Sequence, residues 1–234
     1  MAVFEATYPS DVLVKHDRTP AHSVAALLQV RSCRAEGSLP AEGSLPAEGS
    51  LQLANNFLLA MPGLVGDYFA STLTYVCEHN EEGALGIMVN RATDLSVLEL
   101  VSQLGLPTPH SLAEINVLEG GPVSPERGFV LHSPDKTFES SAELSDTLFM
   151  STALDVLEAI ANNQGPQRYL VALGYAGWGA GQLEDEIANN VWLTAPGEKA
   201  DDILFNTPLN DRLNVAAATL GIDFSLIASK PGHA

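Results

Sequence analysis

The hydrophobic pattern divides the chain, from residue 53 onward, into short apolar segments separated by glycine, proline and polar turns. Segments of this length and composition predict β-strands over residues 56–61, 73–79, 84–90, 115–118, 128–132 and 147–150. The sequence Asn-Glu-Glu-Gly over residues 80–83 suits a hairpin loop. We therefore expect at least part of the sheet to be antiparallel.

Apolar residues three or four positions apart predict helices over residues 96–104, 153–160, 183–188, 198–205 and 209–220. Ser96 with Glu99 fits a capping box, and Leu157 is expected on the buried face of the second helix. Strands interleaved with helices and no internal linker indicate an α/β (α+β) single domain over residues 52–234, with a mixed sheet flanked by helices.

The segment over residues 168–193 is the centre of this pattern. It predicts a buried strand over residues 169–173, a glycine-rich turn, a short acidic helix and a return to extended chain. The expected ligand-binding residues are Gly174, Tyr175, Gly177 and Trp178 of the turn, with His132 and Trp192 nearby. The aromatic rings would form rigid walls with a polar handle, beside backbone left uncovered by glycine.

A structural interpretation of the same glycines is that they permit a tight turn and close packing. The spacing matches neither the dinucleotide fingerprint nor a P-loop. The acids at positions 184–186 would also repel a phosphate, and a solvated first helical turn explains them. The turn thus favours a neutral or cationic ligand, or a peptide.

The first 51 residues differ from the rest in composition. The sequence AEGSLP occurs at residues 35–40 and 41–46, and AEGSLQ follows at 47–52. Such a repeat buries little apolar surface, so residues 1–51 are expected to form a flexible extension that the domain does not need for stability.

Charge and cysteine content restrict the partners and the location. Eleven basic and 29 acidic residues give a formal net charge of −18, which disfavours direct binding to nucleic acids or anionic membranes. Two cysteines are consistent with a reducing cytosol. The chain contains no convincing signal peptide and no apolar run of membrane-spanning length, so a cytoplasmic protein is expected.

Five motifs occur in order: LQLANNFLLAMPGL, YVCEHNEEGALGIMVN, LEGGPVSPERGFVLHSP, LVALGYAGWGAGQLEDEI and NVWLTAP. Together they strongly resemble the AlgH/YqgE family of bacterial proteins, from residue 51 to the C-terminus. The resemblance implies a mixed β-barrel surrounded by helices. It also implies a proposed role in transcriptional regulation of alginate production, but it supplies no catalytic residue and no cofactor.

Two further arrangements could carry chemistry. Alternation along residues 73–79 would place Tyr75, Cys77 and His79 on one face, where Cys77 and His79 could form a thiolate–imidazole pair. The alternative, which is the usual one for a single cysteine in an apolar strand, is that Cys77 belongs to the core. His132, at a strand end, could act as an acid, a base or a ligand contact, or could simply fix a loop. We expect no metal site, because the histidines lack ligand spacing.

Two hypotheses about function follow. The first is a cytosolic regulator that binds a small ligand or a protein partner, without a cofactor and without contacting DNA. The alternative is a small-molecule enzyme that uses a pocket near Cys77, His79 or His132. The absence of a catalytic motif favours the first.

Overall fold

The central strand of the predicted pattern is also the central strand of the structure, a computed structural model that describes residues 52–62, 68–112, 115–152 and 154–224. This strand, β9 (Tyr169–Gly179), pairs with β6 along its first half, with β3 along its second half, and with β5 in parallel. The extension predicted over residues 1–51 lies outside the described residues.

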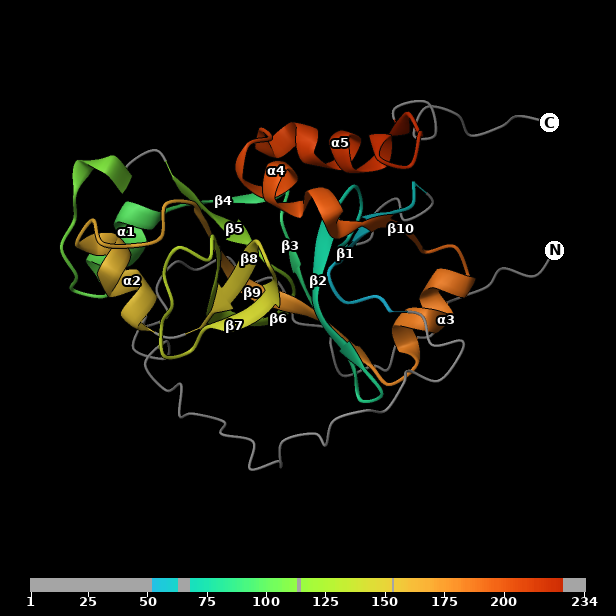
Figure 1. Ribbon diagram of the computed structural model, residues 1–234, viewed down its shortest axis with the longest axis horizontal. Coiled ribbons are helices and arrows are strands. Elements are labelled where there is room, and N and C mark those ends of the chain that lie inside the picture. Colours follow the sequence, from blue (N-terminus) through green and yellow to red (C-terminus); the bar gives the residue numbers. More distant parts are fainter. Residues whose placement is uncertain (1–51, 63–67, 113–114, 153, 225–234) are drawn as a thin grey trace.

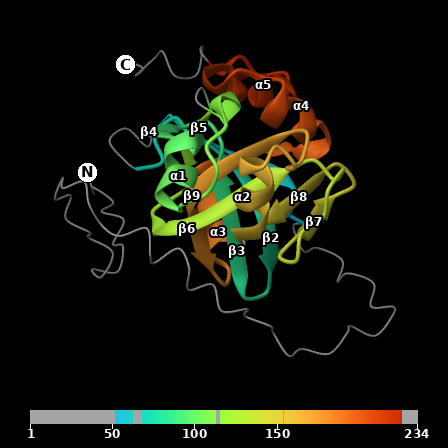
Figure 2. The same cartoon turned by 90° about the vertical axis from the view of Figure 1, so that its left-hand side faces the viewer.

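The sheet has the strand order β10-β1-β2-β3-β9-β6-β8-β7, and β4 pairs with β5 beside β9. Its strands are β1 (Asn56–Ala60), β2 (Leu73–Asn80), β3 (Gly83–Met88), β4 (Ala92–Ser96), β5 (Asn116–Glu119), β6 (Val123–His132), β7 (Ala142–Ser145), β8 (Leu148–Ser151) and β10 (Trp192–Pro196). Figures 1 and 2 show that the sheet curls into a half-barrel. The expected mixed, partly antiparallel and barrel-like sheet is therefore confirmed.

The helices form three groups around this sheet (Figure 1). They are α1 (Val97–Gln103), α2 (Leu154–Ala161), α3 (Gln182–Ala188), α4 (Ala200–Phe205) and α5 (Arg212–Ala218), with short 3-10 turns at His110–Leu112, Gly197–Lys199 and Leu209–Asp211. In the described part of the chain, no helix is long and apolar enough to cross a membrane.

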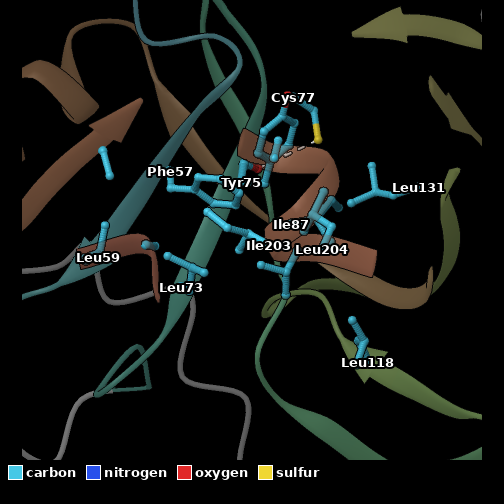
Figure 3. Close-up of a cluster of buried hydrophobic side chains, with 14 of the residues drawn as sticks. Phe57, Leu59, Leu73, Tyr75, Cys77, Ile87, Leu118, Leu131, Ile203 and Leu204 are labelled. Carbon is cyan, nitrogen blue, oxygen red and sulfur yellow. Dashed lines mark hydrogen bonds between the residues drawn. The ribbon is translucent and has the colours of Figure 1, made fainter. Parts of the chain in front are cut away.

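Cross-strand register explains how the sheet supports a different cluster on each face. Phe57 pairs with Tyr75 and Tyr75 with Ile87, so these side chains form one row that packs against α4 and α5. Figure 3 shows Ile203 and Leu204 of α4 among them. Residues one position away, such as Val76 and Leu58, pack beneath α3.

The helices α1 and α2 cover a third cluster at the other end of the half-barrel (Figure 1). The predicted capping box of α1 is confirmed: the Glu99 N–H donates to Ser96 Oγ at 3.1 Å, and the Ser96 N–H donates to Glu99 Oε2 at 2.9 Å. Leu157 of α2 is 8% exposed, as its apolar spacing predicts. Ala153, expected at the start of this helix, lies outside the described residues.

The glycine-rich turn predicted after residue 173 is wrong, because β9 continues as a strand to Gly179. Gly174 has a φ of +73°, and a Cβ atom there would lie 2.3 Å from the Gly121 carbonyl oxygen. The glycine therefore lets β9 bend and approach a second backbone while its strand pairing resumes. The turn is formed instead by Ala180 and Gly181, the two residues directly before α3.

The hydrophobic pattern also missed two strands, and the helices predicted over residues 198–205 and 209–220 both begin as 3-10 turns. The strands β4 and β7 are short and largely polar, so alternation gives little signal. The helix predicted over residues 209–220 is divided into a 3-10 turn and α5. Arg212 begins α5 and is only 6% exposed, since it donates hydrogen bonds to the carbonyl oxygens of Val89 and Leu204.

Candidate functional site

A β-bulge separates the two side chains of the predicted Cys77–His79 pair. In the pairing of β2 with β3, Val76 is opposite Gly86 and Glu78 is opposite Leu85, so the register skips Cys77. An extra residue reverses the alternation that follows it. His79 consequently reaches α3, where its Nε2 lies 3.0 Å from Glu184 Oε1, and the predicted shared face is wrong.

The Cys77 thiol remains in the apolar core with Tyr75 (Figure 3). It is 7% exposed, and its Sγ lies 3.7 Å from the Tyr75 carbonyl oxygen. Burial raises the pKa of the Cys77 thiol well above its usual range, which favours the neutral form. Nucleophilic cysteines have the opposite environment, an accessible one that stabilises the thiolate.

His132 is completely buried and fully hydrogen-bonded. Its Nδ1 lies 2.9 Å from the Ser133 carbonyl oxygen, and its Nε2 lies 2.9 Å from Ser151 Oγ. Because a carbonyl oxygen can only accept, Nδ1 carries a proton, and in the neutral ring Nε2 accepts from the Ser151 hydroxyl. Ser151 Oγ in turn lies 2.8 Å from Ser141 Oγ, so the Ser141 hydroxyl donates to it.

The surroundings of His132 favour its neutral form. Its ring packs edge-on against Phe138 and Phe149, with ring centroids 5.5 and 6.0 Å away. Burial lowers the pKa of His132, and the hydrogen bond to the Ser133 carbonyl and the charge of Asp135 oppose this only in part. The imidazole thus joins β6 and β8 in a chain of satisfied hydrogen bonds, as expected for a histidine that fixes a loop.

Two of the three acidic residues of α3, Glu184 and Glu186, bind the helix to the sheet, contrary to the expected solvated first turn, while Asp185 is exposed. Glu186 Oε2 accepts hydrogen bonds from both indoles, 2.9 Å from Trp178 Nε1 and 2.7 Å from Trp192 Nε1. The two rings meet edge to face with centroids 5.9 Å apart. One carboxylate therefore satisfies two partly buried donors and holds α3 over the face of the sheet that carries Val76 and Leu58.

A hollow of about 340 Å³ lies at the far end of β9, beside the β2–β3 hairpin. Its lining residues come from four strands and the hairpin loop: Glu78, Asn80, Glu82, Gly83, Ala84, Leu85, Val123, Tyr175, Gly177 and Trp178. Figure 1 shows the hairpin and the end of β9 projecting together below the half-barrel. We call this the hairpin hollow.

The floor of the hairpin hollow follows from strand register and one missing side chain. Glu78 pairs with Leu85, and Leu85 pairs with Gly177, so these residues form a row across β2, β3 and β9. Gly177 leaves a gap in that row. The Tyr175 ring borders the gap, because a Cβ atom on Gly177 would lie 3.2 Å from Tyr175 Cε2.

The rim of the hollow is acidic and locally ordered. Glu78 and Glu82 are both exposed. The Asn80 amide donates to Glu78 Oε1 at 2.8 Å, and Asn80 Oδ1 accepts from the Glu82 N–H at 2.8 Å. Asn80 therefore connects the two acidic residues across the hairpin loop.

The structure brings only some of the expected site residues together. Tyr175, Gly177 and Trp178 line the hairpin hollow, while Gly174 packs against the backbone of Gly121. Trp192 contacts Trp178 in the cluster beneath α3. His132 pairs with Tyr169 at the opposite end of β9, so it lies away from the hollow.

Sequence reasoning missed the contribution of the hairpin, namely Glu78, Glu82 and Leu85, and that of Val123 on β6. The hairpin with its loop within residues 80–83 was predicted and is confirmed, although Asn80 and Gly83 pair and only Glu81 and Glu82 form the loop. However, its position next to β9 follows only from the order of strands in the sheet.

The fold and the hollow define a half-barrel α/β domain with a hollowed face at one end of its central strand. The chain belongs to the AlgH-like family (DUF179), whose family model matches residues 57–225. A UPF0301 protein of Thioalkalivibrio sulfidiphilus is 51% identical over 180 residues, covering 77% of this chain and 96% of that protein. A UPF0301 protein of Pseudomonas aeruginosa is 48% identical over 185 residues, covering 78% and 96%.

Solved structures have the same fold. The solution structure of the AlgH protein from Pseudomonas aeruginosa matches with a TM-score of 0.65 at 46% identity, covering 80% of this chain and all of that one. The crystal structure of protein DIP2367 from Corynebacterium diphtheriae matches with a TM-score of 0.59, covering 79% of this chain and 95% of that one. At 19% identity, the second similarity shows the fold alone.

Proposed function

We propose that this chain is a cytoplasmic regulator of gene expression that acts by binding a protein partner or a small ligand in the hairpin hollow, without contacting DNA. The observation that carries the proposal is the hollow itself, with an apolar floor at Leu85 and Gly177 and exposed carboxylates at Glu78 and Glu82. A concave apolar site with a few convergent polar groups is the usual form of a binding site.

Two observations favour binding over the alternative of catalysis. Cys77 is a buried thiol, separated from His79 by the bulge. His132 is buried, with both ring nitrogens engaged by the protein. Neither side chain lines the hairpin hollow. The regulatory part of the proposal rests on the role implied by the family resemblance.

Charge supports an indirect mode of regulation. A chain with a formal net charge of −18 repels nucleic-acid phosphates, and the rim of the proposed site is itself acidic. On a column of immobilised DNA at low salt, we expect the full chain to elute without retention. Tight retention that salt reverses would contradict this part of the proposal.

Partner binding is tested by native mass spectrometry of the full chain purified from its own host. Gly177→Leu should remove any retained species, since the new side chain fills the hollow. Gly179→Leu is the matched control, because a Cβ atom at Gly179 has only Gln182 Oε1 nearby, at 3.9 Å, and Gly179 does not line the hollow. A species retained equally by both variants would place binding elsewhere.

A further inference from the structure

We infer that the occupant of the hairpin hollow is a lysine or arginine side chain presented by a partner protein. This inference rests on the proposed function and adds the chemistry of the partner. It requires a narrow apolar channel for the aliphatic part of the side chain, a negative group for its charged end, and an opening toward the partner. The described residues supply each of these.

The channel is the part of the hollow beside Gly177, which carries no side chain of its own. Leu85 lies beside the gap in the neighbouring strand, and the Tyr175 ring and Val123 border it on β9 and β6. A Cβ atom on Gly177 would lie 3.2 Å from Tyr175 Cε2 and 3.9 Å from Val123 Cγ2. An unbranched methylene chain can contact these surfaces while its charged end stays in water.

The negative groups are placed at the mouth of this channel. Glu78 occupies the row next to Leu85, and Asn80 connects it to the loop that carries Glu82. Arg127, a cation on the neighbouring strand β6, lies over the Phe129 ring at 5.4 Å from its centroid and does not line the hollow. The rim therefore attracts an external cation, consistent with the net charge of the chain.

The exposure of the lining favours a side chain of a protein over a free amine. Glu78, Glu82 and Gly177 are all exposed, so an occupant remains accessible from outside. A single side chain in such a hollow gains little affinity alone, whereas a partner protein gains further contact area around it. We therefore infer that the hollow receives one side chain from a larger basic surface on the partner protein.

The test is an NMR titration of the ¹⁵N-labelled full chain with three probes. The first is acetyl-Ala-Lys-Ala-amide, the second is the same peptide with norleucine in place of lysine, and the third is spermidine. We expect the lysine peptide to shift the amide resonances of Leu85, Tyr175 and Gly177. The norleucine peptide should bind on the order of tenfold more weakly, because it lacks the ion pairs with two carboxylates.

Matched variants locate the charge effect. Glu78→Gln and Glu82→Gln should each weaken binding of the lysine peptide on the order of threefold, the scale of an exposed ion pair. Glu158→Gln on α2 is the control, because it removes the same charge from an exposed site outside the hollow and should leave binding unchanged. Added salt should weaken binding to the wild-type chain.

Four results would overturn the inference. Equal binding of the lysine and norleucine peptides would show an apolar site without charge selection. Spermidine binding without lysine-peptide binding would identify a free polyamine as the occupant. Shifts located away from the hollow, or no shift with any probe, would also reject it.

The proposed function is tested separately, by native mass spectrometry. It predicts that Gly177→Leu loses the bound species that the wild-type chain retains from its host. If that species is lost while the norleucine peptide binds as well as the lysine peptide, the inference fails and the proposed function stands. If Gly177→Leu retains the species, the proposed function fails, and the inference that rests on it fails too.

Discussion

The two ends of β9 have opposite surroundings. At the first end, Tyr169 pairs with His132, and the polar groups around that histidine are buried with partners. At the other end, Gly177 pairs with Leu85 beside exposed acidic residues, and a hollow remains. His132 and Gly177 were both expected at one ligand-binding site, but only Gly177 lines the hollow, while His132 lies at the opposite end of the strand. Burial, not residue type, separates the packed end of β9 from the end that carries the hollow.

The largest expected effect is at the buried end. Leu157→Ala should lower the free energy of unfolding by about 2–5 kcal/mol, because a buried leucine is replaced by a cavity. Leu157 packs with Val130 and Val171 behind the first half of β9. Chemical denaturation measures the change. A change within error would show that this end is not tightly packed.

Two alanine substitutions in the same strand compare the ends directly. Gly174→Ala should cost at least about 2 kcal/mol, since it combines a positive φ with backbone contact at Gly121. Gly177→Ala should change stability by less than about 1 kcal/mol, because the Tyr175 ring needs to move only slightly. Thermal denaturation of both variants tests this. Equal losses would show that the hollow is as constrained as the strand bend.

The link between α3 and the sheet should contribute less than the core. Glu186→Ala should cost about 1–3 kcal/mol, because both indole N–H groups lose their acceptor. Tryptophan emission should shift to the red as the rings become hydrated. Asp185→Ala, at an exposed position of the same helix, is the control. If both variants behave alike, the indole hydrogen bonds do not hold α3.

His132 should make stability depend on pH. Its folded-state pKa is lowered from the usual 6.5, so the unfolded chain takes up a proton first as the pH falls. The stability contributed by neutral His132 is complete above about pH 6.5 and declines as the pH falls toward the lowered pKa. Denaturation of wild type and His132→Gln should show a smaller pH slope in the variant. His110→Gln, at an exposed histidine, should retain the wild-type slope.

The smallest expected effect lies outside the described residues. Deletion of residues 2–50 should leave the melting temperature nearly unchanged, because the AEGSLP repeats have little apolar surface to bury. Differential scanning calorimetry of the full and shortened chains tests this. A large loss would mean that the extension packs on the domain.

The sequence by itself determined the features that depend on neighbouring residues. The capping box at Ser96, the hairpin at residues 80–83 and the burial of Leu157 each follow from spacing within a few positions. The order of motifs also determined the family and, through it, the barrel-like mixed sheet.

Only the tertiary structure decided which of these residues meet. Strand order places the β2–β3 hairpin beside β9, and the bulge at Cys77 directs His79 to α3 and Glu78 to the hollow. Gly174 and Gly177 look alike in the sequence, yet Gly174 contacts a second backbone, whereas Gly177 lies beside the flexible Tyr175 ring at the hairpin hollow. The physical reason is that these contacts join residues far apart in the chain, and a single inserted residue reverses every side chain after it.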